Sequence, residues 1–308
     1  MDINPIALPP QHKYRSAAQC GRNIRGADIT MQTNFLRPII AILGVMAAAG
    51  ILQAASPAMA QGDLLVAPTR IILDGRRGTE VILSNIGSEE STYRIGLELR
   101  RMTATGQLID VEEEAANERE QAALSMIRYA PRRITLPPGQ PQAVRIAARP
   151  GADLPDGEYR VHMSFRAIPT PRPVTEAPVE SQGISIKLVP IYGVTIPIIV
   201  RHGRLQATVA IHDPKIVAGE RGPELHIAMS RSGASSTYGE LRVTRPGSDE
   251  PVFLARGIAI YSELAERTVQ FDLTPEQAAA LKGQLRFEYR EMPEAGGALI
   301  AAVETVLG

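Results

Sequence analysis

Hydrophobic and polar residues alternate in short runs along most of the chain from residue 64 onward. Residues 93–99 (YRIGLEL) and 159–165 (YRVHMSF) carry an apolar residue at every second position. Further short apolar runs are residues 64–67, 80–84 and 143–147. Turn formers such as the Pro-Pro-Gly of residues 137–139 separate the runs. A period of two with Gly and Pro turns predicts strands, and many short strands predict an all-β sandwich.

The same pattern resumes beyond residue 203, which predicts a second β-sandwich. Its expected strands are residues 206–211, 224–229, 239–244, 256–261, 267–273, 283–289 and 298–307. We therefore divide the chain into a first domain over residues 61–202 and a second over residues 203–308.

Two segments have helical character instead. Residues 274–281 (TPEQAAAL) place Thr274 as an N-cap before a proline, which predicts one short helix. Residues 111–124 (VEEEAANEREQAAL) contain good helix formers with a thin apolar stripe. We expect this second segment to be a solvated helical insert or loop and not a core helix.

Residues 184–201 (ISIKLVPIYGVTIPIIVR) form an unusually long apolar run, in which every even position from 184 to 200 is apolar or proline. An average strand has about 5–6 residues. Pro190 and Pro197 lack the N–H group that a central strand donates to its neighbours. The run is therefore expected to be a long edge strand. The alternative is two successive core strands broken near Gly193.

The first sixty residues are expected to lie outside the fold. Residues 38–55 are apolar and uncharged, follow Arg37 and precede an Ala-Met-Ala sequence that ends at Ala60. This layout predicts a signal peptide over residues 31–60, cleaved near Ala60; a retained membrane anchor is the alternative. Residues 1–30 precede Met31 without a periodic pattern, so we interpret them as a non-physiological upstream extension.

Composition narrows the classes of function. The chain has 33 Lys+Arg and 33 Asp+Glu, a formal net charge of zero, and 4% aromatic residues. A nucleic-acid-binding protein would normally carry a basic excess and stacking aromatics. The single cysteine, Cys20, excludes an intramolecular disulfide and a thiolate metal cluster.

Motifs of catalysis and cofactor binding are absent from the sequence. The five histidines do not follow metal-ligand spacings, and the chain has no G-x-S-x-G, P-loop or G-x-G-x-x-G sequence. We expect no enzyme activity, no cofactor, no metal and no small-molecule substrate.

Several segments, in order, resemble the periplasmic pilus-assembly chaperones of the chaperone–usher pathway, the PapD-like family. They are residues 66–75 (VAPTRIILDG), residues 131–146 with LPPGQPQAVRI, residues 157–169 (GEYRVHMSFRAIP), and residues 196–201 (IPIIVR), which stand where the family has I-K-L-F-Y-R. The resemblance covers most of residues 64–203. The second domain matches only as a β-sandwich of suitable size.

The resemblance implies two immunoglobulin-like β-sandwiches in an L or boomerang arrangement, located in the periplasm. Such a chaperone binds pilus or fimbrial subunits by donor-strand complementation and delivers them to an outer-membrane usher. A lent strand supplies main-chain hydrogen bonds, and its alternate side chains enter pockets of the subunit. The donor side chains implied here are Ile186, Leu188, Tyr192, Val194 and Ile196.

The family also anchors the carboxylate terminus of the subunit with an arginine and a lysine. Arg70 occupies the arginine position, but Pro197 occupies the lysine position. Lys187 could substitute only in another register. This departure indicates an atypical branch of the family. The competing interpretation is a non-catalytic structural or adhesive β-sandwich of the cell surface, whose long strand is simply core.

Overall fold

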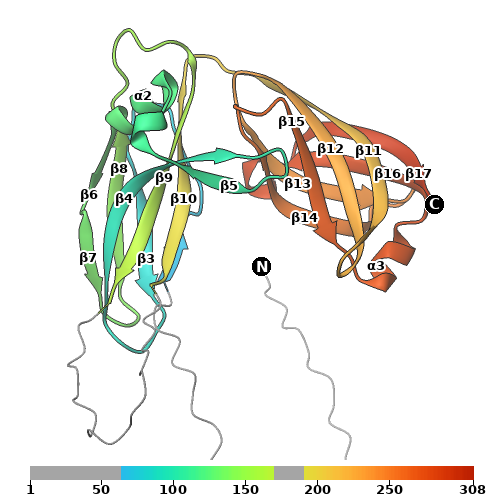
Figure 1. The fold of residues 1–308 in the computed structure, drawn as a ribbon, viewed down its shortest axis with the longest axis horizontal. Coiled ribbons are helices and arrows are strands. Elements are labelled where there is room, and N and C mark those ends of the chain that lie inside the picture. The colour runs from blue at the N-terminus through green and yellow to red at the C-terminus, as the bar shows by residue number, and fades with distance from the viewer. Residues whose placement is uncertain (1–63, 170–190) are drawn as a thin grey trace, which may run out of the picture. The chain divides into compact units, whose positions relative to one another are not determined.

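The computed structural model describes residues 64–169 and 191–308, which form two β-sandwiches (Figure 1). The prediction of an all-β chain with two sandwiches is confirmed. The proposed extension, signal peptide and cleavage point, together with Ile186, Lys187, Leu188 and Pro190, lie outside the described residues. Within the described ranges, no helix is long and apolar enough to cross a membrane.

The first sandwich has two sheets. One has the order β1-β3-β8-β6, and the other β2-β10-β9-β4-β5, with β7 also paired to β4. Their bounds are β1 Leu64–Ala67, β2 Ile71–Leu73, β3 Thr79–Asn85, β4 Ser91–Met102, β5 Leu108–Val111, β6 Ile127–Ala130, β7 Arg133–Leu136, β8 Pro141–Ala148, β9 Gly157–Ile168 and β10 Gly193–His202. The arrangement corresponds to the A-B-E-D and G-F-C sheets of an immunoglobulin-like domain.

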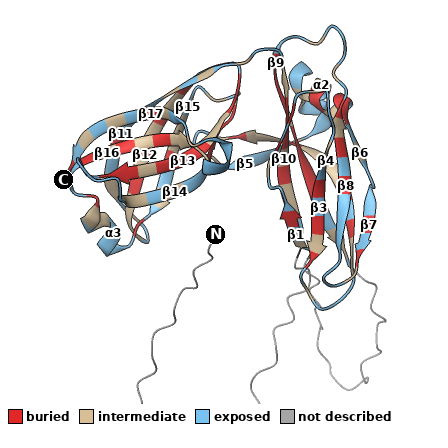
Figure 2. Cartoon of the chain, turned by 180° about the vertical axis from the view of Figure 1, so that it is seen from behind, coloured by how far each residue is buried: buried red, intermediate tan, exposed pale blue. Residues whose placement is uncertain are grey.

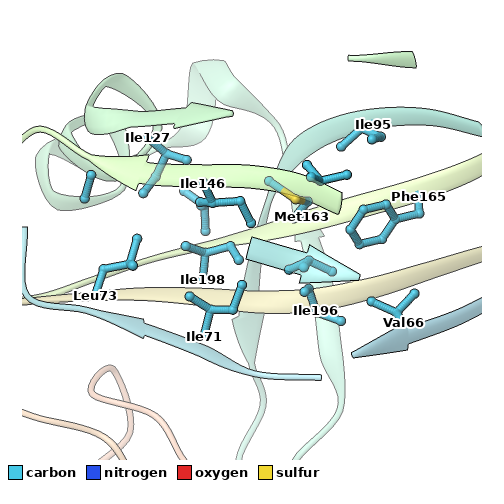
Figure 3. Close-up of a cluster of buried hydrophobic side chains, with 14 of the residues drawn as sticks. Val66, Ile71, Leu73, Ile95, Ile127, Ile146, Met163, Phe165, Ile196 and Ile198 are labelled. Atoms are coloured by element: carbon cyan, nitrogen blue, oxygen red, sulfur yellow. The ribbon is translucent and has the colours of Figure 1, made fainter. Parts of the chain in front are cut away.

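Alternate residues of these strands fill the space between the two sheets. Val161, Met163 and Phe165 of β9 are at most 1% exposed, whereas the residues between them face away from this core. Ile196 and Ile198 of β10 lie in the same cluster (Figure 3). The period of two in the sequence thus reports which face of each strand is buried.

The helical insert differs from its prediction. Helix α2 spans Glu118–Met126, after a 3-10 turn at Glu113–Ala115, and Asn117 and Glu120 form a capping box at its start. Ala123 and Met126 are buried in the core of the first sandwich. The expectation of a solvated insert or loop is therefore wrong at the C-terminal end of the helix, where Ala123, inside the segment 111–124, and Met126, just beyond it, are buried.

The second sandwich has a three-stranded sheet, β11-β12-β15, and a four-stranded sheet, β14-β13-β16-β17. Its strands are β11 Ala207–Gly219, β12 Gly222–Gly233, β13 Thr237–Thr244, β14 Pro251–Ile260, β15 Glu266–Asp272, β16 Gly283–Glu291 and β17 Leu299–Leu307. Buried residues recur along the strands of both sandwiches (Figure 2). Helix α3, Pro275–Ala280, is capped by Thr274 as predicted, and a 3-10 turn covers Pro293–Ala295.

The change from one sandwich to the other falls between β10, which ends at His202, and β11, which begins at Ala207. The exact domain boundary at residues 202 and 203 stays a prediction.

Candidate partner-binding site

The first half of β10 has one open edge. Residues 193–202 pair with β9, but β2 pairs only with Ile198, Ile199 and Val200 on the other side. The reason lies in β1, which pairs with β3 of the opposite sheet before the chain crosses to β2. Among the described residues, no strand pairs with residues 193–197 on the side opposite β9. We call this side of residues 193–197 the open edge.

The peptide groups of residues 193–197 point alternately to β9 and to the open edge. The N–H of Ala167 in β9 donates to the carbonyl oxygen of Tyr192 at 2.9 Å. In an antiparallel pair, alternate residues bond to the partner strand, so the peptide groups of Gly193 and Thr195 point to the open edge. Pro197 is tolerated because the N–H that it lacks would also have pointed there.

The even-numbered side chains of β10 divide into two groups. Tyr192, just before the strand, is 49% exposed. Val194 is half-buried against the core cluster, and Ile196 is 2% exposed within it. Ile196 therefore fills the core of its own sandwich, and the donor assignment does not extend to it. Tyr192 alone among the described donor candidates is both exposed and of the correct parity.

Arg70 lies beside the open edge, immediately before β2. Its Nη2 donates to Ser236 Oγ at 3.2 Å, and its guanidinium carbon lies 4.6 Å from the ring centre of Tyr238. Burial lowers the pKa of Arg70. Within the described residues Arg70 forms no salt bridge, and its buried Nε has no hydrogen-bond partner. A guanidinium without a carboxylate partner has N–H groups that can donate to an anion.

Two ion pairs take part in the contact between the sandwiches. The pair Glu158–Arg201 lies within the first sandwich and binds Ser236 of the second, and the pair Arg160–Glu263 joins the two sandwiches directly. Glu158 of β9 is 1% exposed and binds Arg201 at 3.1 Å, and its Oε2 also accepts from the N–H of Ser236 at 3.0 Å. Ser236 lies in the turn between β12 and β13. Glu158 therefore pairs with Arg201 and, among the described residues, forms no salt bridge with Arg70.

The second ion pair joins Arg160 of β9 to Glu263, which follows β14. The two Arg160 Nη atoms donate to the two carboxylate oxygens at 2.9 and 2.6 Å, and the Met102 N–H donates to Oε1 at 3.0 Å. Burial alone would raise the pKa of Glu263, but these donors hold that pKa below its usual range. The Arg160 guanidinium stacks on Tyr261, 3.6 Å from the ring centre.

Sequence reasoning did not single out Glu158, Arg160, His162, Ser236 or Tyr261. A partial signal was available, because the polar positions of residues 159–165 fall on one face of a strand whose other face is apolar. Their partners in the second sandwich lie in turns and strand ends, which carry no periodic pattern. In residues 64–169 and 191–308, no group of three or more His, Cys, Asp or Glu side chains could hold a metal ion.

No family model and no curated protein matches the chain. Among solved structures, the chain is similar to the CsuC–CsuE chaperone–tip adhesion subunit pre-assembly complex from archaic chaperone–usher Csu pili of Acinetobacter baumannii. The identity is 13%, 80% of this chain and 99% of that chain are covered, and the TM-score is 0.41.

Two further similar structures are of chaperones. For the Salmonella enterica SafA pilin in complex with the SafB chaperone, the identity is 15%, the coverage 80% and 97%, and the TM-score 0.41. For the Pseudomonas aeruginosa CupB2 chaperone, the identity is 14%, 79% of this chain and 100% of that chain are covered, and the TM-score is 0.39. These names belong to the class of protein that the sequence resembles. At such TM-scores the similarity alone decides nothing about function, which has to be argued from the residues.

Proposed function

We propose that this chain is a periplasmic chaperone that binds secreted pilus or fimbrial subunits by donor-strand complementation and delivers them to an outer-membrane usher. The observation that carries the proposal is Arg70, a partly buried cation beside the open edge that forms no ion pair within residues 64–169 and 191–308. The sequence resemblance places the arginine of the family's carboxylate anchor at this residue.

The open edge supplies main-chain hydrogen bonds to a partner strand. Gly193 and Thr195 point their peptide groups outward, as β-augmentation requires. Tyr192 and the residues before it, which include Ile186 and Leu188, would supply apolar side chains on one face. Burying each such side chain contributes about 1.5–3 kcal/mol before ordering costs.

Arg70 fixes the end of the partner strand. Arg70 is a cation that has no carboxylate partner among the described residues. A terminal carboxylate would supply the negative charge and accept hydrogen bonds from the guanidinium. A hydrogen bond to a charged group contributes roughly 1.5–3 kcal/mol. The register of the partner strand on the open edge is thereby set at one end. Lys187 remains a proposed second anchor residue only in another register.

The alternative, a cell-surface structural or adhesive sandwich, requires β10 to be an ordinary core strand. The second half of β10 fits that role, since Ile198 and Val200 are buried and have a strand on each side. Among the described residues, the first half has no strand beside it on the side opposite β9, which leaves its main chain available to a partner strand. The open edge therefore favours the chaperone.

Isolation of the native complex tests the proposal. The tagged full-length chain is expressed in its own host, the co-purifying protein is identified by mass spectrometry, and its binding is then measured with purified components. We expect a small secreted β-sandwich subunit. Arg70→Ala should weaken binding roughly 10- to 100-fold, whereas Arg76→Ala, at an exposed arginine of a turn, should leave it unchanged. Equal binding by both variants and the wild type would contradict the anchor.

A further inference from the structure

A row of three residues crosses the sheet at the open edge. Ile71 of β2 is paired with Ile198, so Arg70 lies beside Pro197, and Pro197 is in turn paired with His162 of β9. Because successive side chains of a strand point to opposite faces, these three share one face. The residues that follow or precede them, such as Ile198 and Val161, are buried on the core face.

His162 is the unexplained member of this row. His162 is 1% exposed, and its ring is nearly perpendicular to that of Tyr261, with 6.3 Å between the ring centres. Neither ring nitrogen has a hydrogen-bond partner among residues 64–169 and 191–308. The large majority of buried side-chain polar atoms in proteins are hydrogen-bonded, so two orphan nitrogens in one ring call for an explanation.

The groups around His162 offer donors and few free acceptors. Burial, and then Arg160, Arg100 and Arg70, lower the pKa of His162 to about 3, so the ring is neutral and carries one N–H. Glu98 of β4 is paired with His162 across the strands, but its carboxylate is bound by Arg100 at 3.2 Å and Arg166 at 2.6 Å. The Nε atoms of Arg70 and Arg160 are also without partners in the described ranges.

We propose that His162 donates the second hydrogen bond to the carboxylate terminus of the bound partner, beside Arg70. The inference rests on the proposed function. Pro197 has no N–H and no charged group, so the middle of the row supplies no donor that a carboxylate could use. The anchor of this chain therefore consists of a guanidinium and a neutral imidazole, where the resemblance would place an arginine and a lysine.

The test compares two forms of the captured subunit, one with its native carboxylate terminus and one with a terminal amide made by protein ligation. His162→Leu should bind the carboxylate form about tenfold more weakly than wild type and the amide form equally well. His162→Gln, which keeps a side-chain N–H, should stay close to wild type. An equal loss for both forms, or no loss for either, would overturn the proposal.

If His162→Leu fails to fold, a measurement on the wild-type protein still tests the proposal. The ring ¹⁵N signals of His162 should shift when the carboxylate form is added and should not shift with the amide form. Unshifted signals with both forms would overturn the role of His162. Failure of the proposed function is distinguishable, because the wild-type chain would then bind neither form and Arg70→Ala would change nothing.

Discussion

Glu158 and Ser236, which belong to different sandwiches, are joined by two hydrogen bonds to a single carboxylate oxygen. Glu158 Oε2 accepts from the Ser236 N–H at 3.0 Å and from the Ser236 hydroxyl at 2.9 Å. Arg201 completes the set, donating to the same oxygen at 3.1 Å and to the Ser236 carbonyl at 2.9 Å. Arg70 also donates a hydrogen bond to the Ser236 hydroxyl. Ser236 therefore belongs both to the contact between the sandwiches and to the surroundings of the proposed carboxylate anchor.

Loss of the Glu158 charge should therefore destabilise the chain. In Glu158→Gln the Arg201 guanidinium loses its ion pair and the hydrogen bonds of Ser236 lose a charged acceptor. Because the Arg201 side chain is partly exposed, we expect a loss of about 1.5–3 kcal/mol, the range of a hydrogen bond to a charged group. Urea unfolding monitored by circular dichroism measures the free energy of unfolding. Glu80→Gln is the matched control, because its bond to Arg145 joins exposed side chains and should contribute less than about 1 kcal/mol. Similar losses of unfolding free energy in the two variants would argue against a stabilising contact of Glu158 with Arg201 and Ser236.

A charge at Tyr192 should disrupt binding without affecting the fold. Tyr192 is 49% exposed in the free chain and would be buried against the subunit. Tyr192→Asp places a carboxylate in an apolar pocket, so we expect affinity for the subunit to fall at least 100-fold. Ile86→Asp, at a residue that is 64% exposed in a turn of the first sandwich, is the control and should bind normally. Calorimetric titration measures the affinity of both variants, and melting curves verify that they fold. Normal binding by a folded Tyr192→Asp variant would contradict the prediction.

Hydrogen exchange should reveal the open edge directly. The amide of Thr195 points away from β9 and, within the described residues, has no strand beside it, whereas the amide of Ile196 belongs to the β9 ladder. We expect Thr195 to exchange much faster than Ile196 in the free chain and to become protected in the complex. Residue-resolved exchange measured by NMR provides both rates. A slowly exchanging Thr195 in the free chain would support the alternative of an ordinary core strand.

Local pattern predicted most of the fold and little of the site. The alternation in residues 93–99 and 159–165 correctly predicted strands there, because burial of one sheet face imposes a period of two on the sequence. Helix α2 was expected to be solvated because its apolar stripe is thin, but Ala123, inside that segment, and Met126, just beyond it, pack into the core. Helix α3 was predicted correctly since Thr274 and Pro275 signal a start by themselves.

The site depends on contacts across large sequence distances. Arg70 meets Ser236 from 166 positions away, and Arg160 meets Glu263 from 103 positions away. No periodicity links such residues, and only the family resemblance drew attention to Arg70. The apolar even positions of β10 lie on one face of the strand, where Ile196, Ile198 and Val200 are buried in the core of the first sandwich. The sequence does not indicate which even positions are core residues, and the donor role of Tyr192 stays a prediction.

His162 should also make stability depend on pH. Its pKa is about 3 in the folded chain and about 6.5 when unfolded, so below pH 6.5 the unfolded chain binds a proton that the folded chain does not. Stability is therefore lost as pH falls, by about 1.3 kcal/mol between pH 7 and pH 5.5 from this residue. The carboxyl groups with lowered pKa, such as Glu263, lose their contribution at lower pH and hardly affect this interval.

Urea unfolding of wild type and His162→Gln at both pH values measures the effect. The variant should show a flatter dependence on pH, with the two stability curves converging as the pH falls. His226→Gln, whose imidazole binds Glu224 at 2.8 Å on the second sandwich, is the matched control for a histidine with a partner. If the pH dependence of His162→Gln equals that of the wild type, His162 is not held neutral in the fold, and its role as a neutral donor would have to be abandoned.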